Sequence, residues 1–344
     1  TSTSAASEPS GWSESPPAAS CCVPAPSGWR SSGVASSTAC EGCEDSGLTA
    51  DLDRLRTDDD AWDAFVGGTD TDFPLQISAW ATAKAPYGWS SARVVADGGS
   101  GPIGGQLLMR SLGPGPFAMG YAPRGPVATV FDQASLDAWT TAVREFASSR
   151  RLTHVTADPG LEGEAHHPLF AEAGWEPADV VQLTSTQVID LSLTEEELWH
   201  DVYKSSRRYA NGARKKGCYV EEVGEEAMEV FYEILAETAT RSGFIPRAIE
   251  AYADVHRAFA ADGNARILIG YLPDGTPVSS KMIVTSGGRM SQLYGGLSEE
   301  GGKARSGHFF EWEAIIRCKA AGATIFDMWG RSTKGIAHFK QGFG

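Results

Sequence analysis

The two halves of the chain carry the same order of secondary-structure patterns, and this repetition narrows the folds open to it. Each half has a predicted β-hairpin, then a long amphipathic helix, then a buried strand. The hairpin and the helix fall at 91–112 and 133–151 in the first half, and at 265–287 and 308–322 in the second. This order indicates an α+β fold with mixed strand pairing, and its repetition indicates a duplicated domain.

The limits of the two units follow from composition. Residues 1–47 are mostly Ser, Ala, Gly, Pro and Thr, which bury too little apolar surface to offset the ordering of the backbone. Across the whole chain, however, 42% of the residues are hydrophobic, which is enough for two cores. We therefore predict a disordered low-complexity tail at 1–57, a first domain at 58–193 and a second domain at 194–344.

Charge is distributed unevenly along the chain. The formal net charge of −15 argues against a nucleic-acid-binding protein, because phosphate contacts need a basic surface. Yet residues 1–72 hold thirteen acidic and three basic side chains, whereas residues 73–344 hold 31 and 26. The segment Lys204–Lys216 has six basic residues and no acidic one. This segment is either a solvated helix face or a binding site for a diphosphate or an RNA backbone.

Two isolated lysines are further candidates for chemistry. Lys340 follows Phe339 in a glycine-rich segment, where a cation could stabilise the oxyanion of an acyl transfer. Lys84 lies close to Tyr87 and Trp89, and a cation beside aromatic rings suits a sugar or a nucleotide. The structural alternatives are a surface-loop lysine for the first and a helix-end lysine packed on aromatic rings for the second.

Motifs for metal, cofactor or nucleophilic chemistry are not evident. The chain has no GxSxG, no phosphate-binding P-loop and no GxGxxG followed by an acidic ribose partner, and its histidines lack metal-ligand spacing. Cys40 and Cys43 have the spacing of a zinc knuckle, but their would-be partners Cys21 and Cys22 are adjacent, which strains a tetrahedral site. We therefore expect neither a metal nor a bound cofactor.

Five segments, in order, resemble the Fem family (FemABX) of aminoacyl-tRNA-dependent peptidoglycan-bridge peptidyltransferases. The resemblance covers about residues 70–344. Its most specific part is the final Phe-Lys-x-Gly-Phe-Gly after Asp-x-x-Gly. The segments are QISAWATAKAPYGW (76–89), YAPRGPV (121–127), SSRRYANGARKKG (205–217), FDMWG (326–330) and GIAHFKQGFG (335–344).

The resemblance implies two tandem GNAT-like acyltransferase domains. Some members of the family carry a coiled-coil arm in the second domain, but the stretch 225–263 is too short for one, so we expect none. The family usually continues beyond the final motif, so we expect a truncated C-terminus. The acetyl-CoA signature of GNAT enzymes is not evident, and GGKARSG (301–307) does not fit it, which favours aminoacyl-tRNA as the donor.

The resemblance also implies an activity and its partners. The reaction would transfer an amino acid from aminoacyl-tRNA, a co-substrate rather than a cofactor, to the stem-peptide amine of a peptidoglycan precursor. The acceptor would be lipid II or UDP-MurNAc-pentapeptide, and the product an interpeptide bridge. We expect a cytoplasmic monomer with peripheral contact to the inner membrane surface. The alternatives are a GNAT-type N-acyltransferase for a small amine or a protein, and a non-catalytic binding module.

Site residues follow from the same resemblance. Lys340 would stabilise the tetrahedral oxyanion, with Phe339 beside it facing the acceptor end of the tRNA. A general base stays open, because Asp132 is the first carboxylate after the Gly-Pro loop and substrate-assisted deprotonation is the alternative. The residues expected to bind the acceptor are Lys84, Arg207, Arg208, Trp89, Tyr121 and Tyr294.

Overall fold

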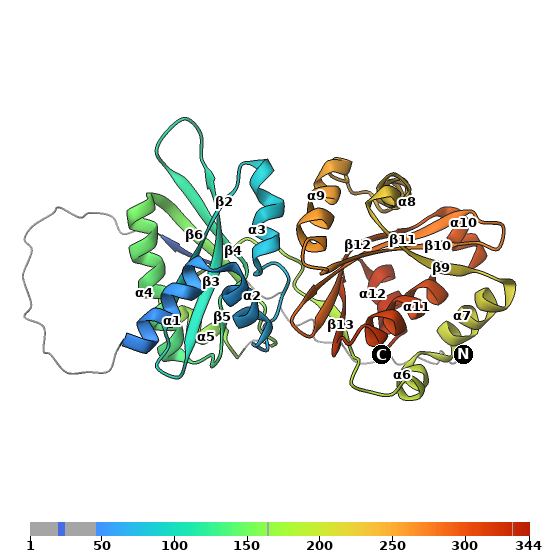
Figure 1. The fold of residues 1–344 in the computed structure, drawn as a ribbon, viewed down its shortest axis with the longest axis horizontal. Coiled ribbons are helices and arrows are strands. Elements are labelled where there is room, and N and C mark those ends of the chain that lie inside the picture. Colours follow the sequence, from blue (N-terminus) through green and yellow to red (C-terminus); the bar gives the residue numbers. More distant parts are fainter. Residues whose placement is uncertain (1–19, 25–45, 164, 332) are drawn as a thin grey trace, which may run out of the picture.

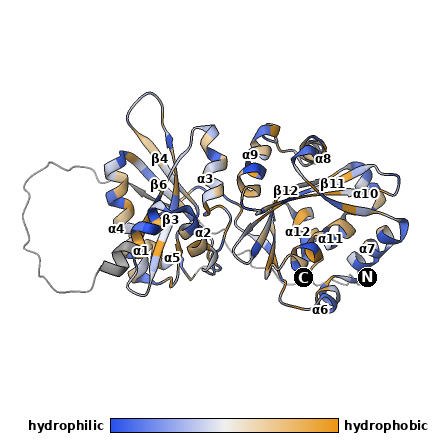
Figure 2. Cartoon of the chain, viewed as in Figure 1, coloured by the Kyte–Doolittle hydropathy of each residue, from blue (hydrophilic) through white to orange (hydrophobic). Residues whose placement is uncertain are grey.

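The computed structural model describes residues 20–24, 46–163, 165–331 and 333–344. They form two β-sheets with helices packed around each, lying side by side along the long axis of the molecule (Figure 1). Helix α7 (Lys204–Lys216) is mainly hydrophilic, whereas hydrophobic residues are frequent along the strands (Figure 2). This is the distribution expected when each sheet buries its faces under helices.

The first sheet has the strand order β2-β3-β4-β6-β1-β7, with β5 paired to β3. Its strands are β1 (Ser20–Pro24), β2 (Ser90–Asp97), β3 (Pro102–Ser111), β4 (Ala118–Arg124), β5 (Val127–Ala128), β6 (Leu152–Pro159) and β7 (Glu176–Ala178). The helices of this domain are α1 (Ser46–Thr57), α2 (Asp59–Gly67), α3 (Ser78–Lys84), α4 (Gln133–Arg150) and α5 (His167–Glu172), with the 3-10 turn η1 (Ala85–Tyr87) after α3.

The second sheet has the strand order β8-β13-β12-β11-β10-β9. Its strands are β8 (Thr186–Asp190), β9 (Tyr219–Val223), β10 (Ala265–Tyr271), β11 (Pro277–Ser286), β12 (Arg289–Leu297) and β13 (Ile325–Gly330). The remaining helices are α6 (Glu195–Asp201), α7, α8 (Met228–Ser242), α9 (Ile249–Ala260), α10 (Glu299–Ala304), α11 (Gly307–Ala320) and α12 (Lys334–Gln341), with the 3-10 turn η2 (Glu225–Ala227) before α8.

The repetition expected from the sequence is present in the strand pairing. In the first sheet β4 and β6 are parallel and α4 connects them, and in the second β12 and β13 are parallel and α11 connects them. The hairpin that precedes each parallel pair is antiparallel. The duplicated α+β fold is therefore confirmed. Between β9 and β10 the described chain forms only η2, α8 and α9, so it carries no coiled-coil arm there.

Local sequence explains where the main helices begin and how closely they pack. Asp132 caps the start of α4, and Trp139 of that helix lies over β3 at Gly105, where a Cβ atom would come within 2.9 Å of the indole. Glycine at this position therefore permits the close approach of helix and sheet. The capping box at the start of α6, in which Thr194 and Glu197 satisfy each other's backbone amides, has the form that the sequence predicts.

The predicted disordered tail is wrong in two places. Ser20–Pro24 pairs antiparallel with both β6 and β7, and Ser46–Thr57 is helical. The amphipathic pattern before residue 58 is sufficient for a helix, and this helix buries Leu52 and Leu55 in the core. The pair Cys40 and Cys43 lies outside the residues that the structure describes.

The predicted boundary between the domains also needs correction. The strand at 186–190 was assigned to the first domain, but it pairs antiparallel with β13 in the second sheet. The chain therefore passes from one domain to the other before Thr186, in the segment 179–185. Strand pairing, and not order along the chain, decides to which sheet an edge strand belongs.

One buried hydrophobic cluster contains residues of both domains. Helix α3 of the first domain packs against α9 of the second, and Trp62 and Trp80 belong to the same buried cluster as Tyr252. At another contact a Cβ atom on Gly287 would lie 2.5 Å from the carbonyl oxygen of Gly67. A ligand bound between the domains would therefore meet a defined surface from both. None of the described helices is long and apolar enough to cross a membrane.

Candidate functional site

A large pocket lies between the two domains in the described part of the chain. Its volume is about 1240 Å³, and both domains contribute to its walls. The first domain provides the loop after α2 (67–73), Arg124 and the segment after β6 (159–163). The linker (183–186) and the ends of β12 and β13 complete the lining. An interdomain pocket of this size with both polar and aromatic walls is a natural ligand site.

Arg289 crosses the domain boundary at the wall of this pocket. Its Nε donates to Asp72 Oδ1 of the first domain at 2.8 Å, and its Nη1 lies 3.4 Å from Asp327 Oδ2 of the second. The guanidinium also stacks on Phe73, 4.5 Å from the ring centroid. Burial raises the pKa of Asp72, and the Arg289 guanidinium opposes that rise. All three charged side chains are buried, so Arg289 fixes the relative position of the domains.

One aspartate on β6 of the first sheet and one on β13 of the second sheet have matching roles. On β6, Asp158 accepts hydrogen bonds from Tyr121 Oη at 2.9 Å and from the amide of Arg124 at 2.7 Å. On β13, Asp327 accepts from the amide of Trp329 at 2.7 Å and from the hydroxyl of Thr186. Arg124 and Trp329 both have left-handed backbone conformations, with φ of 57° and 61°. The carboxylates therefore hold two strained turns at the pocket wall.

Tyr121, which the resemblance places in the acceptor groove, is instead buried behind that wall. Its hydroxyl donates to Asp158 and accepts from Gln182 Nε2 at 3.2 Å. Burial and the Asp158 carboxylate raise the pKa of Tyr121. Tyr121 therefore connects the first sheet to the interdomain linker, and its hydroxyl is already occupied.

Lys340 lies on α12 and reaches the backbone at the end of β13. Its Nζ donates to the carbonyl oxygens of Met328, Trp329 and Gly330 at 2.6, 2.9 and 2.7 Å. Burial lowers the pKa of Lys340 to about 8, and Glu311 acts in the opposite direction. The three ammonium hydrogens are thus used to hold the turn that carries Trp329 into the pocket wall.

Phe339, next to Lys340, belongs to an aromatic cluster in the second domain. Its ring lies 4.9 Å from that of His308 and 5.4 Å from that of Phe343. Burial lowers the pKa of His308. Phe339 therefore seats α12 against α11, and through α12 it positions Lys340.

Lys84 is the most unusual cation of the site. Only 7% of this residue is exposed, and its Nζ lies 3.9 Å from the centroid of the Trp80 ring. The described residues offer its ammonium no carboxylate within ion-pair distance. Burial, and then the positive charge of Arg247, lower the pKa of Lys84 to about 7. A desolvated lysine with a second cation nearby and no counter-ion is suited to an anionic ligand.

Aromatic side chains surround this pair of cations. Burial raises the pKa of Tyr294 to about 12, and the same Arg247 acts against that rise. The Tyr252 ring meets the Tyr294 ring edge-on at 4.9 Å, and Tyr252 Oη accepts a hydrogen bond from the Arg247 amide at 3.1 Å. Lys84 and Tyr294, both expected from the sequence, therefore lie around Arg247. We define Lys84, Arg247, Tyr252 and Tyr294 as the cation–tyrosine cluster.

Arg247 and Tyr252 were missed by the sequence reasoning. They lie at the junction of α8 and α9, where the sequence GFIPRAIEAY shows only a helix end and a new start. No charge run or motif marks Arg247. Only the packing of α9 against α3 brings it close to Lys84.

The two expected arginines of α7 lie elsewhere. Figure 1 shows α3 at the domain interface and α7 at the far side of the second domain. Arg207 donates to the carbonyl oxygens of Trp199 and His200 at 3.0 and 2.7 Å, and so caps the end of α6. A diphosphate held jointly by Lys84 and Arg207 does not fit this arrangement.

Arg208 belongs to an exposed basic surface instead. Its guanidinium lies 5.1 Å from the ring of Tyr209, and Arg305 lies 5.2 Å from the same ring. Hydrogen bonding to Arg208 and the charge of Arg305 lower the pKa of Tyr209. Trp89, the last expected residue, lies in the first domain at the start of β2, with Arg110 5.5 Å from its ring.

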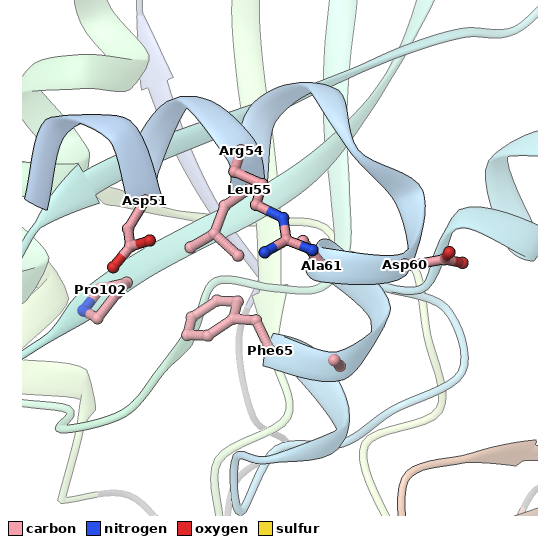
Figure 3. Close-up of a pocket in the computed structure, with 8 residues that line it drawn as sticks. Asp51, Arg54, Leu55, Asp60, Ala61, Phe65 and Pro102 are labelled. Atoms are coloured by element: carbon pink, nitrogen blue, oxygen red, sulfur yellow. The ribbon is translucent and has the colours of Figure 1, made fainter. Parts of the chain in front are cut away.

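A second, smaller pocket lies on the first domain (Figure 3). It has a volume of about 430 Å³ and lies between α1, α2 and the start of β3. Leu55 and Phe65 form its floor, with Arg54 and Asp60 at its edges (Figure 3). None of the expected site residues lines either pocket. The interdomain pocket and the cation–tyrosine cluster form the candidate site because both lie where the two domains meet.

Comparison with known proteins agrees with this two-domain arrangement. A family model described as the FemAB family matches residues 57–172, and one described as an acetyltransferase (GNAT) domain matches residues 200–341. A crystal structure of FemX superimposes with a TM-score of 0.71 at 19% sequence identity, covering 82% of this chain and 91% of that one. A conserved protein of unknown function from Bacteroides thetaiotaomicron gives a TM-score of 0.55 at 13% identity, covering 83% and 92%.

Curated relatives carry a functional name. A lipid II:glycine glycyltransferase of Staphylococcus epidermidis is 28% identical over 231 residues, which is 63% of this chain and 55% of the relative. A protein of the same name from Staphylococcus aureus is 26% identical over a region of the same length, again covering 63% and 55%. The chain thus spans about half the length of the curated relatives that it matches.

Proposed function

Because this chain belongs to the FemAB family, we propose that it is an aminoacyltransferase of peptidoglycan bridge formation. In this proposal aminoacyl-tRNA is the donor, and the acceptor is the stem-peptide side-chain amine of a lipid-linked precursor such as lipid II. The lipid-linked form is favoured by the name of the staphylococcal relatives, lipid II:glycine glycyltransferase. A single copy acting at the cytoplasmic face of the membrane is sufficient, since one chain supplies both parts of the site.

The observation that carries the proposal is the cation–tyrosine cluster. Lys84 and Arg247 place two positive charges at the domain interface, and the Lys84 ammonium has no carboxylate partner among the described residues. A diphosphate, which lipid II and its UDP-linked precursor share, would supply the missing charge. Tyr252 and Tyr294 add aromatic surface on which a sugar ring can pack. The cluster therefore binds the anionic end of the acceptor.

The chemistry requires little beyond positioning. The acceptor amine attacks the ester carbonyl of the aminoacyl-tRNA, the new C–N bond forms, and the tRNA ribose oxygen leaves with the proton that the amine loses. Holding an amine and an activated ester together supplies most of the acceleration. The interdomain pocket is large enough for the reacting ends, and the Trp329 turn lies at its wall.

Lys340 stabilises the oxyanion of the tetrahedral intermediate. Its Nζ reaches the end of β13 and donates to three carbonyl oxygens, so it exchanges one of them for the developing negative charge. The buried carboxylates Asp72 and Asp327 are both paired with Arg289, and Asp158 is held by Tyr121. None of these three is a free base, which favours deprotonation of the amine by the substrates themselves.

The match of residues 200–341 to an acetyltransferase domain supports a second candidate, an N-acyltransferase that uses an acyl thioester. Transfer assays with muropeptide precursor and a charged tRNA pool, with mass analysis of the product, test the first proposal. Removal of tRNA by ribonuclease before the assay should abolish product formation. Transfer that survives complete removal of tRNA, or that requires acyl-CoA, would replace the first proposal by the second.

A further inference from the structure

Three loops at one side of the molecule carry exposed hydrophobic residues next to arginines. In the second domain, the connection between α8 and α9 exposes 95% of Ile245 and 46% of Phe244. In the first domain, the β3–β4 loop exposes 53% of Leu112 and 56% of Phe117. Tyr87, in η1, is the fifth exposed residue of this side. We call these five residues the apolar rim.

Strand pairing and a hydrogen bond connect the three loops. Ser90 at the start of β2 pairs with Met109 at the end of β3, so η1 and the β3–β4 loop lie at the same end of the first sheet. The hydroxyl of Tyr87 donates to Asp254 of α9 at 2.8 Å, which joins η1 to the second domain. Figure 1 shows the β3–β4 loop, the end of α3 and the α8–α9 connection at the upper side of the molecule.

The charged residues within the rim loops are mainly arginines. The segments 84–92, 110–117 and 238–249 contain Arg110, Arg241 and Arg247 and no Asp or Glu. The neighbouring carboxylates lie on the helices, where Asp254 accepts from Tyr87 and Glu237 lies 4.0 Å from Arg241. Arg110, Arg241 and Arg247 are exposed. The rest of the folded chain is acidic in sum, so the three arginines make these loops a more favourable contact for an anionic surface than most of the molecule.

We propose that the apolar rim docks the protein on an anionic lipid bilayer. Exposed bulky side chains flanked by arginines are matched to the headgroup region, where the apolar tips enter the acyl boundary and the guanidinium groups remain among the phosphates. The rim adjoins the cation–tyrosine cluster, because Arg247 belongs to the cluster and lies two residues after Ile245. Docking therefore places the anion-binding cluster at headgroup height. The role given to this docking rests on the proposed function, in which the acceptor is linked to a lipid.

Flotation of the full chain with vesicles tests the inference without any transfer reaction. Vesicles of phosphatidylcholine containing phosphatidylglycerol should bind the protein, vesicles of phosphatidylcholine alone should bind it much less, and added salt should weaken binding. The double variant Phe244→Ser/Ile245→Ser should bind at least tenfold more weakly, because each side chain loses the gain from apolar burial. Both residues are exposed, so the fold should be unaffected.

A matched control lies at the opposite end of the first domain. Val180 and Val181 of the linker are also exposed, by 48% and 55%. The linker contacts Tyr121, which is bonded to Asp158, and so lies away from the end of β4 that carries the β3–β4 loop. Val180→Ser/Val181→Ser should bind vesicles as the unchanged protein does. Equal loss in both double variants would overturn the inference.

Two other outcomes would also overturn it. An unchanged affinity in the Phe244→Ser/Ile245→Ser variant would mean that another surface, such as the basic helix α7, makes the contact. Failure of the unchanged protein to bind anionic vesicles would assign the rim to a protein partner. Turnover with a soluble UDP-linked acceptor separates this from the proposed function. The rim variant should retain that turnover, whereas an error in the proposed function would remove turnover from the unchanged protein as well.

Discussion

Replacement of Lys84 by methionine should make the protein more stable and its acceptor binding weaker. Lys84 is 7% exposed and lies near Arg247 without a carboxylate partner among the described residues, so the folded state disfavours its charge. Its pKa falls from 10.5 to about 7, which corresponds to about 5 kcal/mol at about 1.4 kcal/mol per pKa unit. The contact of the Lys84 ammonium with the Trp80 ring stabilises the charged form by about 1–2 kcal/mol. We expect Lys84→Met to gain about 3 kcal/mol at pH 6.

The stability gained by Lys84→Met should decrease as the pH rises. Below pH 7 Lys84 is protonated in both the folded and the unfolded chain, so the full penalty is present. Between pH 7 and 10.5 only the unfolded chain keeps the proton, and the stability of the unchanged protein therefore rises with pH. The advantage of Lys84→Met should shrink across this range and be small at pH 10. Urea denaturation of both proteins at pH 6, 8 and 10 measures it.

Two control variants test whether the effect is specific to the buried charge of Lys84. Lys216→Met applies the same substitution to an exposed lysine of α7 and should change stability by less than about 0.5 kcal/mol at each of the three pH values. Lys84→Arg keeps a charge that cannot be lost, so it should show no gain at pH 6. A loss of stability for Lys84→Met at pH 6, or an equal change at every pH, would refute the desolvated-lysine interpretation. In the transfer assay Lys84→Met should raise the KM for the acceptor at least tenfold, because the acceptor loses a charged partner.

Three other substitutions separate structural from chemical roles. Lys340→Met should lower kcat by about 10²–10³-fold, as for the loss of an oxyanion donor, with little change in the KM of the acceptor; steady-state kinetics with the acceptor varied will show this. Arg289→Met should cost about 3–5 kcal/mol in urea denaturation, because it leaves Asp72 and Asp327 buried without their partner; Arg289→Lys, which keeps the charge, should recover part of it. Arg207→Gln should cost about 1–2 kcal/mol through loss of its bonds to the end of α6 and leave the KM of the acceptor unchanged; a clear rise in that KM would return Arg207 to the binding site.

Much of the fold could be predicted because it depends on short-range patterns. The spacing of Leu136, Trp139 and Val143 defines α4, and these three side chains are buried as their spacing predicts. The capping box at Thr194 fixes the start of α6 for the same reason, since the partners are three residues apart. The edge strand β8 was assigned to the wrong domain because its partner, β13, lies more than a hundred residues away.

The candidate site was predicted only in part. Lys84 stood out through its neighbouring aromatic residues, although the ring that it covers is Trp80, one helical turn earlier, rather than Tyr87 or Trp89. Arg207 was chosen for the density of charge around it, which says nothing about the direction in which a guanidinium points. Arg247 has no distinctive sequence context.

The sequence by itself determined that two α+β units follow one another, because hydrophobic period and capping act over a few residues and are written in order along the chain. Only the tertiary structure decided which cations are buried without a carboxylate partner among the described residues. Lys84 and Lys204 have the same side chain, but α9 covers the first and leaves it near Arg247, whereas the second lies exposed at the start of α7. The cost of removing a charge from water depends on what surrounds it, and that surrounding is assembled from segments distant in sequence.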